Sequence, residues 1–136
     1  ALNLRYQLMP YLWACFERAC QFHQPIIRPT FFNFPHDEGC FADCDDFMLG
    51  DDVLVAPVVE KGAQTRAIYL PKLPDGGQWV DFYDRSVHHG GQAVTCPAPI
   101  GRLPLMVRQG ACIPVAVPPT GQVPRHDDPV TDVLEF

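Results

Sequence analysis

Short apolar runs separated by turn-forming residues fill the chain from Val53 onward, and they constrain its fold more than any other feature. The runs are rich in β-branched and aromatic residues: VLVAPVV, RAIYL, WVDFY, QAVTC, LPLMVR and ACIPVAV. Glycine, proline and aspartate lie between them, most clearly in EKGAQT, LPDGGQ and HHGG. Runs of this kind predict strands, and many short strands at this spacing are typical of an antiparallel β-sandwich. The sequence therefore predicts a mainly β fold.

A helical pattern precedes these runs, over residues 1–23. Apolar side chains recur there at steps of three and four residues, which places them on one face of a helix. They are Leu4, Leu8, Leu12, Cys15, Ala19 and Phe22. Pro10 lacks an N–H and its ring disturbs the preceding turn, so we expect a kink there, and Pro25 marks the end of the helix.

The next segment, PIIRPTFFNFP, is apolar and bounded by prolines, and it predicts a short buried strand over residues 26–34. A helix leading directly into such a strand is half of an α/β unit, and half a unit cannot close a sheet. The chain also starts within the helical pattern and ends in the strand-like DPVTDVLEF. We therefore interpret it as an excerpt of a longer protein, with an incomplete α/β piece at its N-terminus.

Charge and hydropathy disfavour several classes of function. The net charge of −6 provides no basic stripe to neutralise phosphates, so we expect no nucleic-acid partner. The longest apolar run, 53–59, is far shorter than the roughly 20 residues that cross a bilayer. Residues 1–13 carry no signal-peptide pattern. These features favour a protein without membrane contact and a cytoplasmic location.

The cysteines and histidines show no ligand pattern. The six cysteines are Cys15, Cys20, Cys40, Cys44, Cys96 and Cys112. No C-x-x-C pair with downstream histidines completes a zinc site, and nothing indicates a secreted context that would favour disulfides. His88 and His89 precede two glycines and indicate an exposed turn. We predict buried or surface thiols, no metal and no cofactor.

Five aspartates cluster directly ahead of the apolar run at 53–59: Asp43, Asp45, Asp46, Asp51 and Asp52. Paired carboxylates are the usual tools of glycoside hydrolysis, so the cluster is a candidate active site. The structural alternative, which we favour, is that Asp43 and Asp45 cap a short FMLG helix and that the last two aspartates form a turn. Calcium binding and a direct sugar contact are lesser alternatives, and no oxygen-ligand loop with a closing glutamate is present to favour calcium.

Several longer motifs carry a family resemblance. LRYQLMPYLW, IIRPTFFNFP, DDFMLGDDVLVAPVVEKG, AIYLP, WVDFY and APIGRLPLMVRQGACIPV occur in this order and at close spacing. Together they resemble the C-terminal portion of glycoside hydrolase family 31, the α-glucosidase and α-xylosidase family, from residue 1 to about 117. One departure is Asp46, which stands where the family pattern usually has glutamine.

The resemblance implies three segments. Residues 1–50 would be the C-terminal end of a (β/α)₈ barrel, with one of its last helices at 1–23, its eighth strand at 26–34 and a closing loop and short helix at 43–50. Residues 51–117 would form the proximal C-terminal β-sandwich. Residues 118–136 would be a linker and the start of a truncated distal β domain.

Family members are retaining α-glycosidases that use two barrel aspartates, and both lie upstream of the motif that opens this chain. The resemblance therefore assigns no catalytic residue here. It implies a structural or accessory part of an α-glucosidase-like enzyme of carbohydrate metabolism, which is inactive alone. Without the barrel, the apolar helical face lacks its partner, so we expect self-association unless the chain is cut back to about 51–117.

Two other residue groups could touch a sugar. Arg28 lies at the end of the expected eighth strand, where active sites of such barrels gather, and it is the substrate-proximal candidate. The alternative, which we favour, is a buried arginine paired with a barrel carboxylate. The WVDFY aromatics could form a sugar platform, although packing is the favoured interpretation. A non-catalytic carbohydrate-binding β-sandwich module is accordingly the alternative function.

Overall fold

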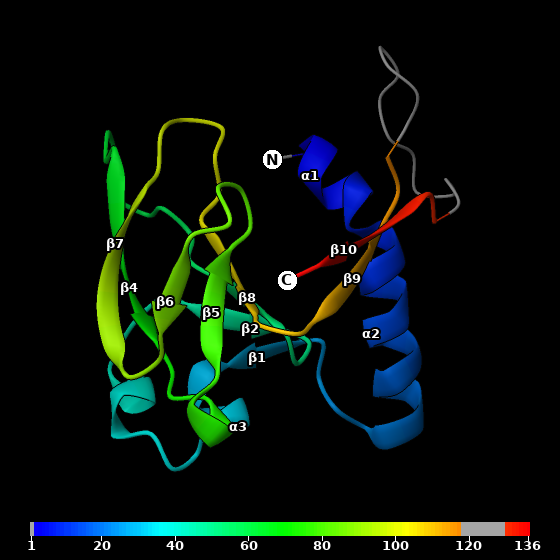
Figure 1. Ribbon diagram of the computed structural model, residues 1–136, viewed down its shortest axis with the longest axis horizontal. Coiled ribbons are helices and arrows are strands. Elements are labelled where there is room, and N and C mark those ends of the chain that lie inside the picture. Colours follow the sequence, from blue (N-terminus) through cyan, green and yellow to red (C-terminus); the bar gives the residue numbers. More distant parts are fainter. Residues whose placement is uncertain (1, 118–129) are drawn as a thin grey trace. The chain divides into compact units, whose positions relative to one another are not determined.

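The computed structural model describes residues 2–117 and 130–136 and divides into two compact units (Figure 1). The larger unit runs from Ile27 to Gln109. The smaller one combines Ala1–Ile26 with Gly110–Phe136.

The larger unit is built from antiparallel strands. Its elements are β1 (Ile27–Pro29), α3 (Thr30–Asn33), η1 (Glu38–Phe41), β2 (Phe47–Leu49), β3 (Val53–Val55), β4 (Thr65–Leu70), η2 (Pro74–Gly76), β5 (Gln78–Asp81), β6 (Val87–His89), β7 (Gln92–Pro97) and β8 (Leu105–Arg108). One sheet has the strand order β1-β2-β3-β8-β5-β6, and β4 pairs with β7 in a second sheet. The mainly β, antiparallel architecture predicted from the sequence is confirmed.

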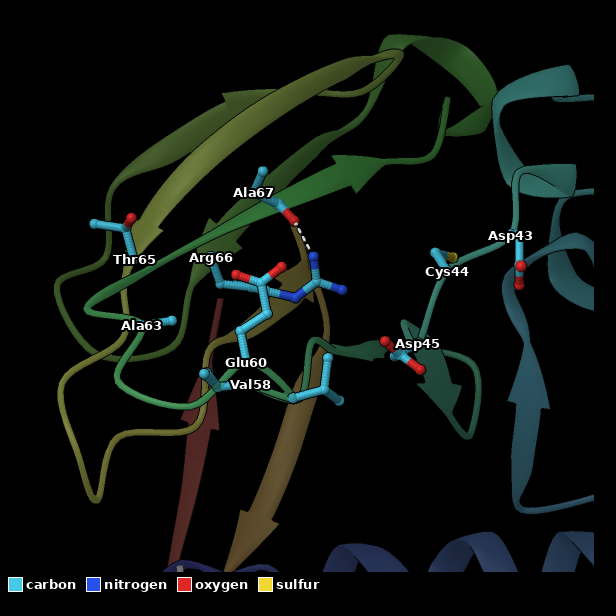
Figure 2. A pocket seen from close by; sticks show the side chains of 10 residues that line it. Asp43, Cys44, Asp45, Val58, Glu60, Ala63, Thr65, Arg66 and Ala67 are labelled. Atoms are coloured by element: carbon cyan, nitrogen blue, oxygen red, sulfur yellow. Dashed lines mark hydrogen bonds between the residues drawn. The ribbon is translucent and has the colours of Figure 1, made fainter.

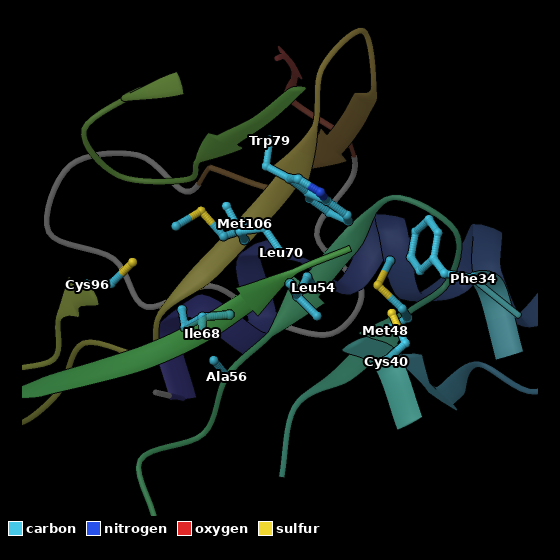
Figure 3. Close-up of a cluster of buried hydrophobic side chains, with 10 residues drawn as sticks. All are labelled: Phe34, Cys40, Met48, Leu54, Ala56, Ile68, Leu70, Trp79, Cys96 and Met106. Atoms are coloured by element: carbon cyan, nitrogen blue, oxygen red, sulfur yellow. The ribbon is translucent and has the colours of Figure 1, made fainter. Parts of the chain in front are cut away.

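The core of this unit draws side chains from both sheets (Figure 3). Met48, Leu54 and Met106 are register partners across β2, β3 and β8, and all three are fully buried. Ile68 and Leu70, two residues apart on β4, point into the same core. Trp79 is completely buried, and its indole N–H donates to the carbonyl of Pro71 at 2.8 Å. Packing is therefore confirmed as the role of this tryptophan.

The smaller unit contains two helices and a strand pair. Its elements are α1 (Leu2–Gln7), α2 (Met9–Phe22), β9 (Cys112–Val115) and β10 (Asp132–Glu135). The helix is interrupted at Leu8, two residues ahead of Pro10. Pro10 lies in the first turn of α2, where its missing N–H costs least. The predicted kink is therefore present. α2 ends at His23, whose backbone adopts the left-handed conformation with φ 56°.

The strand predicted over residues 26–34 is wrong in its second half. β1 ends at Pro29, and Thr30–Asn33 forms the short helix α3. Pro29 has no N–H to donate to a neighbouring strand, but it is compatible with the start of a helix. Phe34 donates its N–H back to the carbonyl of Thr30 at 3.1 Å, which closes the helical turn. Thr30 is buried here, and its hydroxyl donates to the carbonyl of Cys40.

The short helix predicted within residues 43–50 is also wrong. Phe47–Leu49 is strand β2, which pairs with β1 on one side and with β3 on the other. Only Met48 is fully buried, so the segment alternates as a strand does, and pairing on two sides outweighs local preference. The prediction that Asp43 and Asp45 cap a helix there is therefore wrong as well, because Phe47–Leu49 is a strand.

The predicted exposed turn at His88 and His89 is a third correction. Both residues belong to β6, where Trp79 pairs with His88 and Gln78 with His89. The turn itself lies at the glycines that follow.

Two expectations about the chain's organisation remain predictions. One is the domain boundary at residue 50, between the expected barrel end and the expected sandwich; the hydrogen-bonded strands β1, β2 and β3 lie on both sides of it. The linker expected from residue 118 is the other, and residues 118–129 lie outside the described residues. The strand-like ending is confirmed as β10, which pairs with β9. Within the described part of the chain, no helix is long and apolar enough to cross a membrane.

Candidate functional site

Arg28 occupies the middle of β1 and is almost fully buried, with 5% of its surface exposed. Its Nη1 donates to Asp51 Oδ1 at 2.5 Å and to Asn33 Oδ1 at 3.2 Å. The guanidinium carbon also lies 5.6 Å from the ring centroid of Phe32. Asn33 in turn donates from Nδ2 to the carbonyl of Gly50 at 3.1 Å. Arg28 thus ties β1 and α3 to the turn after β2.

The arginine has the carboxylate partner that we favoured from the sequence, but the carboxylate comes from the aspartate cluster of this chain. Arg28 and Asp51 meet because β1 and β2 pair antiparallel, which brings the turn after β2 back beside β1. The spacing of 23 residues between Arg28 and Asp51 gave no sequence signal of this contact.

The five clustered aspartates take different roles. Asp46 is buried and accepts from Arg66 Nη2 at 2.8 Å, whereas Asp51 pairs with Arg28. Asp52 lies in the turn that follows β2, where its carbonyl accepts the N–H of Arg108 at 2.9 Å. The other two, Asp43 and Asp45, line a surface hollow. The aspartates are distributed over separate ion pairs and surfaces.

The hollow lies between residues 43–45 and residues 58–67, and has a volume of about 330 Å³ (Figure 2). Its lining residues are Asp43, Cys44, Asp45, Val58, Val59, Glu60, Ala63, Thr65, Arg66 and Ala67. Three carboxylates and a single guanidinium therefore face it among the described residues. Its acidic lining disfavours an anionic ligand.

Arg66 is already engaged by protein groups. Its Nε donates to the carbonyl of Pro57 at 3.1 Å. Its Nη1 donates to the carbonyl of Ala67 at 2.9 Å, the bond dashed in Figure 2. Its Nη2 donates to Asp46, so every guanidinium nitrogen already has a protein acceptor. The arginine therefore holds the wall of the hollow and has little capacity left to bind a ligand.

Burial raises the pKa of Asp46, the charge of Arg66 opposes this, and the neighbouring Asp45 adds to the rise. A carboxyl with a raised pKa can act as a general acid. Here, however, the carboxylate is committed to Arg66. In the described residues, no group of three or more His, Cys, Asp or Glu side chains is arranged to hold a metal ion.

A buried carboxylate that the sequence did not single out, Asp37, accepts three hydrogen bonds. They come from Lys72 N at 2.7 Å, Tyr69 Oη at 2.8 Å and Gly39 N at 3.1 Å. Burial raises the pKa of Asp37, but these three donors together outweigh it and lower the pKa below its ordinary value. The only sequence signal is local, an aspartate two residues ahead of a glycine, as in an Asx turn.

Asp81 forms a second buried network at the end of β5. It accepts the N–H groups of Tyr83 at 2.7 Å and Asp84 at 3.2 Å, and it pairs with Arg102 at 3.2 Å. Arg102 lies over the ring of Tyr83, 4.4 Å from its centroid. The WVDFY run thus leaves the strand at Asp81, whose carboxylate closes the turn that follows.

No disulfide joins any of the six cysteines in the described structure; Cys15, Cys40 and Cys96 are buried, and Cys20, Cys44 and Cys112 are exposed. Burial raises the pKa of both Cys40 and Cys96 to about 11, and the Asp37 charge adds to the rise at Cys40. Both thiols are therefore protonated and unreactive near neutral pH.

The chain resembles characterised proteins over most of its length. Residues 23–113 match the glycosyl hydrolase family 31 C-terminal domain. Alpha-glucosidase 2 of Bacillus thermoamyloliquefaciens is 37% identical over 112 residues, which are 82% of this chain and 14% of that protein. Human neutral alpha-glucosidase AB is 32% identical over 133 residues, 96% of this chain and 14% of that protein.

Solved structures of GH31 enzymes also match this chain. A GH31 dextranase of Flavobacterium johnsoniae, in complex with glucose, has a TM-score of 0.77 and 36% identity over 84% of this chain and 14% of that one. A GH31 alpha-xylosidase of Xanthomonas citri has a TM-score of 0.76 and 35% identity over 83% of this chain and 12% of that one. The chain thus spans about a seventh of the length of these relatives. It belongs to glycosyl hydrolase family 31 and corresponds to a C-terminal portion of that family's proteins.

Proposed function

We propose that this chain is a structural part of a retaining α-glycosidase of the α-glucosidase type, which acts on α-linked glucosides or related sugars. The chain would contribute no catalytic residue and would be inactive alone. Its relatives include proteins named as α-glucosidases and a structure named as a dextranase. The coverage of about a seventh of each relative supports the view that the chemistry lies elsewhere in the parent protein.

The observation that carries this proposal is the distribution of the clustered aspartates. A retaining glycosidase needs two carboxyl groups about 5 to 5.5 Å apart, both facing the substrate. Here Asp46 is committed to Arg66 and Asp51 to Arg28. Carboxylates held in ion pairs brace the fold, and they are poor candidates for a nucleophile and an acid/base.

Within the parent protein, residues 1–50 would complete a (β/α)₈ barrel, 51–117 would form the proximal sandwich, and 118–136 would lead into a distal β domain. The partners would be that barrel and its carbohydrate substrate. Arg28 would lie near the substrate because it is one residue from the C-terminal end of β1, which would be the last barrel strand, and its pairing with Asp51 would hold that strand in place. The parent would reside in the cytoplasm.

A chimeric enzyme tests the proposal. In alpha-glucosidase 2 of Bacillus thermoamyloliquefaciens, the segment that matches this chain is replaced by residues 1–136. We expect the chimera to hydrolyse an aryl α-glucoside, while the isolated chain shows no turnover. An inactive, misfolded chimera contradicts the proposed role, and so does turnover by the homogeneous isolated chain.

One observation supports a second candidate, the non-catalytic carbohydrate-binding module. Phe31 and Phe41 are 43% and 60% exposed and stack with their ring centroids 5.4 Å apart and 13° between planes. Exposed aromatic faces are suited to stacking on sugar rings. Calorimetric titration of the isolated chain with maltose tests this, with Phe41→Ala as the matched variant. Trp79 is fully buried and cannot report such stacking by fluorescence.

A further inference from the structure

A second surface hollow lies in the larger unit, between residues 58–64, which connect β3 to β4, and residues 98–102, which follow β7. It has a volume of about 320 Å³ and is called the second hollow. Val58, Glu60 and Ala63 line it and also line the first hollow, where Figure 2 shows them, so the two are neighbours. Its size is at the lower end of the roughly 300 to 1,000 Å³ that small-molecule sites occupy.

Backbone hydrogen bonds hold the two sides of the second hollow together. The buried Ala98 donates its N–H to the carbonyl of Gln64 at 2.8 Å, which joins one connection to the other. The N–H of Arg102 donates to the carbonyl of Pro99 at 2.9 Å and closes the turn on the second side. The hollow is therefore formed by the folded chain itself, as ligand sites usually are.

Arg102 brings unused hydrogen-bond donors to this hollow. Among the described residues, its guanidinium donates only to the Asp81 carboxylate, through Nη2 at 3.2 and 3.3 Å. Its Nε is enclosed and has no acceptor in that part of the chain, whereas most buried polar atoms have one. The side chain is 24% exposed, so part of it can be reached from outside. Arg66 differs, because each of its guanidinium nitrogens already has a protein acceptor.

The position of the Arg102 guanidinium is fixed before a ligand binds. It lies over the ring of Tyr83, 4.4 Å from the centroid, while Asp81 holds Nη2. The ring itself is fixed, because the Tyr83 hydroxyl donates to the carbonyl of Leu103 at 2.9 Å. A donor that is already ordered loses little side-chain freedom on binding, which favours affinity.

The charges around the second hollow favour a neutral ligand. Asp81 balances the charge of Arg102, and Glu60 adds a carboxylate to the lining. No excess of positive charge therefore attracts an anion. A cation would meet the guanidinium, and an apolar ligand would cover its unused donors without replacing their hydrogen bonds to water.

The remaining lining residues favour a ligand with hydroxyl groups on an apolar ring. The exposed amide of Gln64 can both donate and accept a hydrogen bond, as a hydroxyl can. Ile100 is fully exposed beside it, and Val58 and Pro99 add further apolar surface. A sugar ring presents hydroxyls at its edge and C–H groups on its faces, so it matches both kinds of lining.

We propose that the second hollow binds a neutral saccharide. Arg102 and Gln64 hydrogen-bond the sugar hydroxyls, and Ile100 contacts a C–H face of the ring. The hydroxyl chemistry follows from the hollow alone, whereas the choice of an α-linked glucose unit rests on the proposed function. The exposed Phe31 and Phe41 rings do not line this hollow.

Amide NMR of the isotope-labelled chain during titration with maltose tests this site. We expect saturable shifts concentrated in residues 62–64 and 98–102. Saturable shifts around Phe31 and Phe41 instead, or a flat titration up to high millimolar maltose, overturn the inference. Inorganic phosphate is the anionic probe and should leave these amides unmoved. Shifts there with phosphate and none with maltose would show an anion site and also overturn it.

Three variants locate the binding contacts. Arg102→Lys keeps a positive charge near Asp81 but loses the planar donors, so we expect maltose affinity to fall by about tenfold or more. Gln64→Ala removes one neutral hydrogen-bonding group at an exposed position and should weaken binding by about fivefold. Gln21→Ala makes the same change on α2, in the smaller unit, and should leave the affinity unchanged.

Gln64→Ala decides the result if Arg102→Lys fails to fold, which its amide spectrum would show. Equal maltose affinity for the wild type and a folded Gln64→Ala contradicts the assigned contacts. A flat titration removes this site but leaves turnover by the chimera as the test of the proposed function. An inactive chimera removes the proposed function, while saturable maltose shifts at 62–64 and 98–102 would still support the saccharide site.

Discussion

The hydroxyl of Tyr69 donates a 2.8 Å hydrogen bond to the buried carboxylate of Asp37, across a separation of 32 residues. This contact joins the segment before η1 to strand β4, and Lys72 N–H reinforces it on the other carboxylate oxygen at 2.7 Å. Burial raises the pKa of Tyr69, and the hydrogen bond to Asp37 and the charge of that carboxylate raise it further, to about 12. The pair links the segment ahead of η1 to β4, and its contribution to the free energy of unfolding can be measured.

Asp37→Asn should destabilise the larger unit by about 1 to 3 kcal/mol, because one amide oxygen replaces a charged acceptor of three bonds and an NH₂ faces existing donors. Urea unfolding followed through Trp79 fluorescence measures this loss of stability, in a Trp13→Phe background where Trp79 is the remaining tryptophan. Asp43→Asn, a change at the rim of the hollow, is the control. Equal midpoints for the two variants would show that the network contributes little.

The same carboxylate should make stability depend on pH. The folded-state pKa of Asp37 is lowered from its ordinary value near 3.8, so the folded state holds fewer protons between those two values. Its stabilisation is complete above the ordinary value and is lost as the pH falls through the lowered one. The stability difference between wild type and Asp37→Asn should therefore shrink as the pH is lowered below about 4. A difference that grows on acidification would contradict this assignment.

Gly39 permits the close approach of Tyr69 to Asp37. A Cβ added at residue 39 would overlap the Tyr69 ring, so Gly39→Ala must displace the ring and break its hydrogen bond. We expect a loss of about 1 to 3 kcal/mol, as for other overpacked sites. In Gly39→Ala/Tyr69→Ala the clash is absent, so the double variant should be more stable than the sum of the single effects predicts. Strict additivity would exclude the clash.

His23 should tolerate glycine with a gain in stability. It ends α2 at φ 56° and ψ 32°, and its N–H donates to the carbonyl of Ala19 at 2.9 Å. A side chain is strained in this left-handed conformation, so His23→Gly should stabilise by about 0.5 to 1 kcal/mol. Gln21→Gly, inside the same helix, should destabilise by about 1 kcal/mol. Thermal unfolding by circular dichroism compares the two, and the same sign for both would refute the capping argument.

The strands of the second half were predictable because each run carries its own pattern. VLVAPVV, RAIYL, QAVTC, LPLMVR and ACIPVAV all contain strands, and turn residues separate them. FMLG was misassigned because its preference is weak and its two partners, β1 and β3, decide its conformation. Local pattern cannot supply that pairing.

The site contacts were less predictable than the strands, because each joins residues far apart in sequence. Asp46 meets Arg66 and Asp51 meets Arg28 only once the sheet has formed. Asp37 carried no signal beyond a local turn.

The structure also revises the proposed truncation to 51–117, which would remove β2 and with it Met48, a fully buried member of the core. That shortened chain should unfold more readily, whatever its effect on self-association.

The Arg28–Asp51 pair should respond asymmetrically to removal of either partner. Arg28 is 5% exposed, whereas Asp51 is 26% exposed and can be hydrated when its partner is lost. Asp51→Asn leaves a buried guanidinium with a weaker acceptor and should cost about 3 kcal/mol, near the lower end for a broken buried pair. Arg28→Met leaves a carboxylate that reaches water and an apolar side chain in a buried position, so its cost should be smaller.

Urea unfolding of both single variants and of Arg28→Met/Asp51→Asn measures this asymmetry. The double variant should be more stable than Asp51→Asn alone, because it no longer buries an uncompensated charge. If Arg28→Met proves the more damaging change, the guanidinium must be held mainly by Asn33 and the Phe32 ring, and Asp51 would then be a secondary partner.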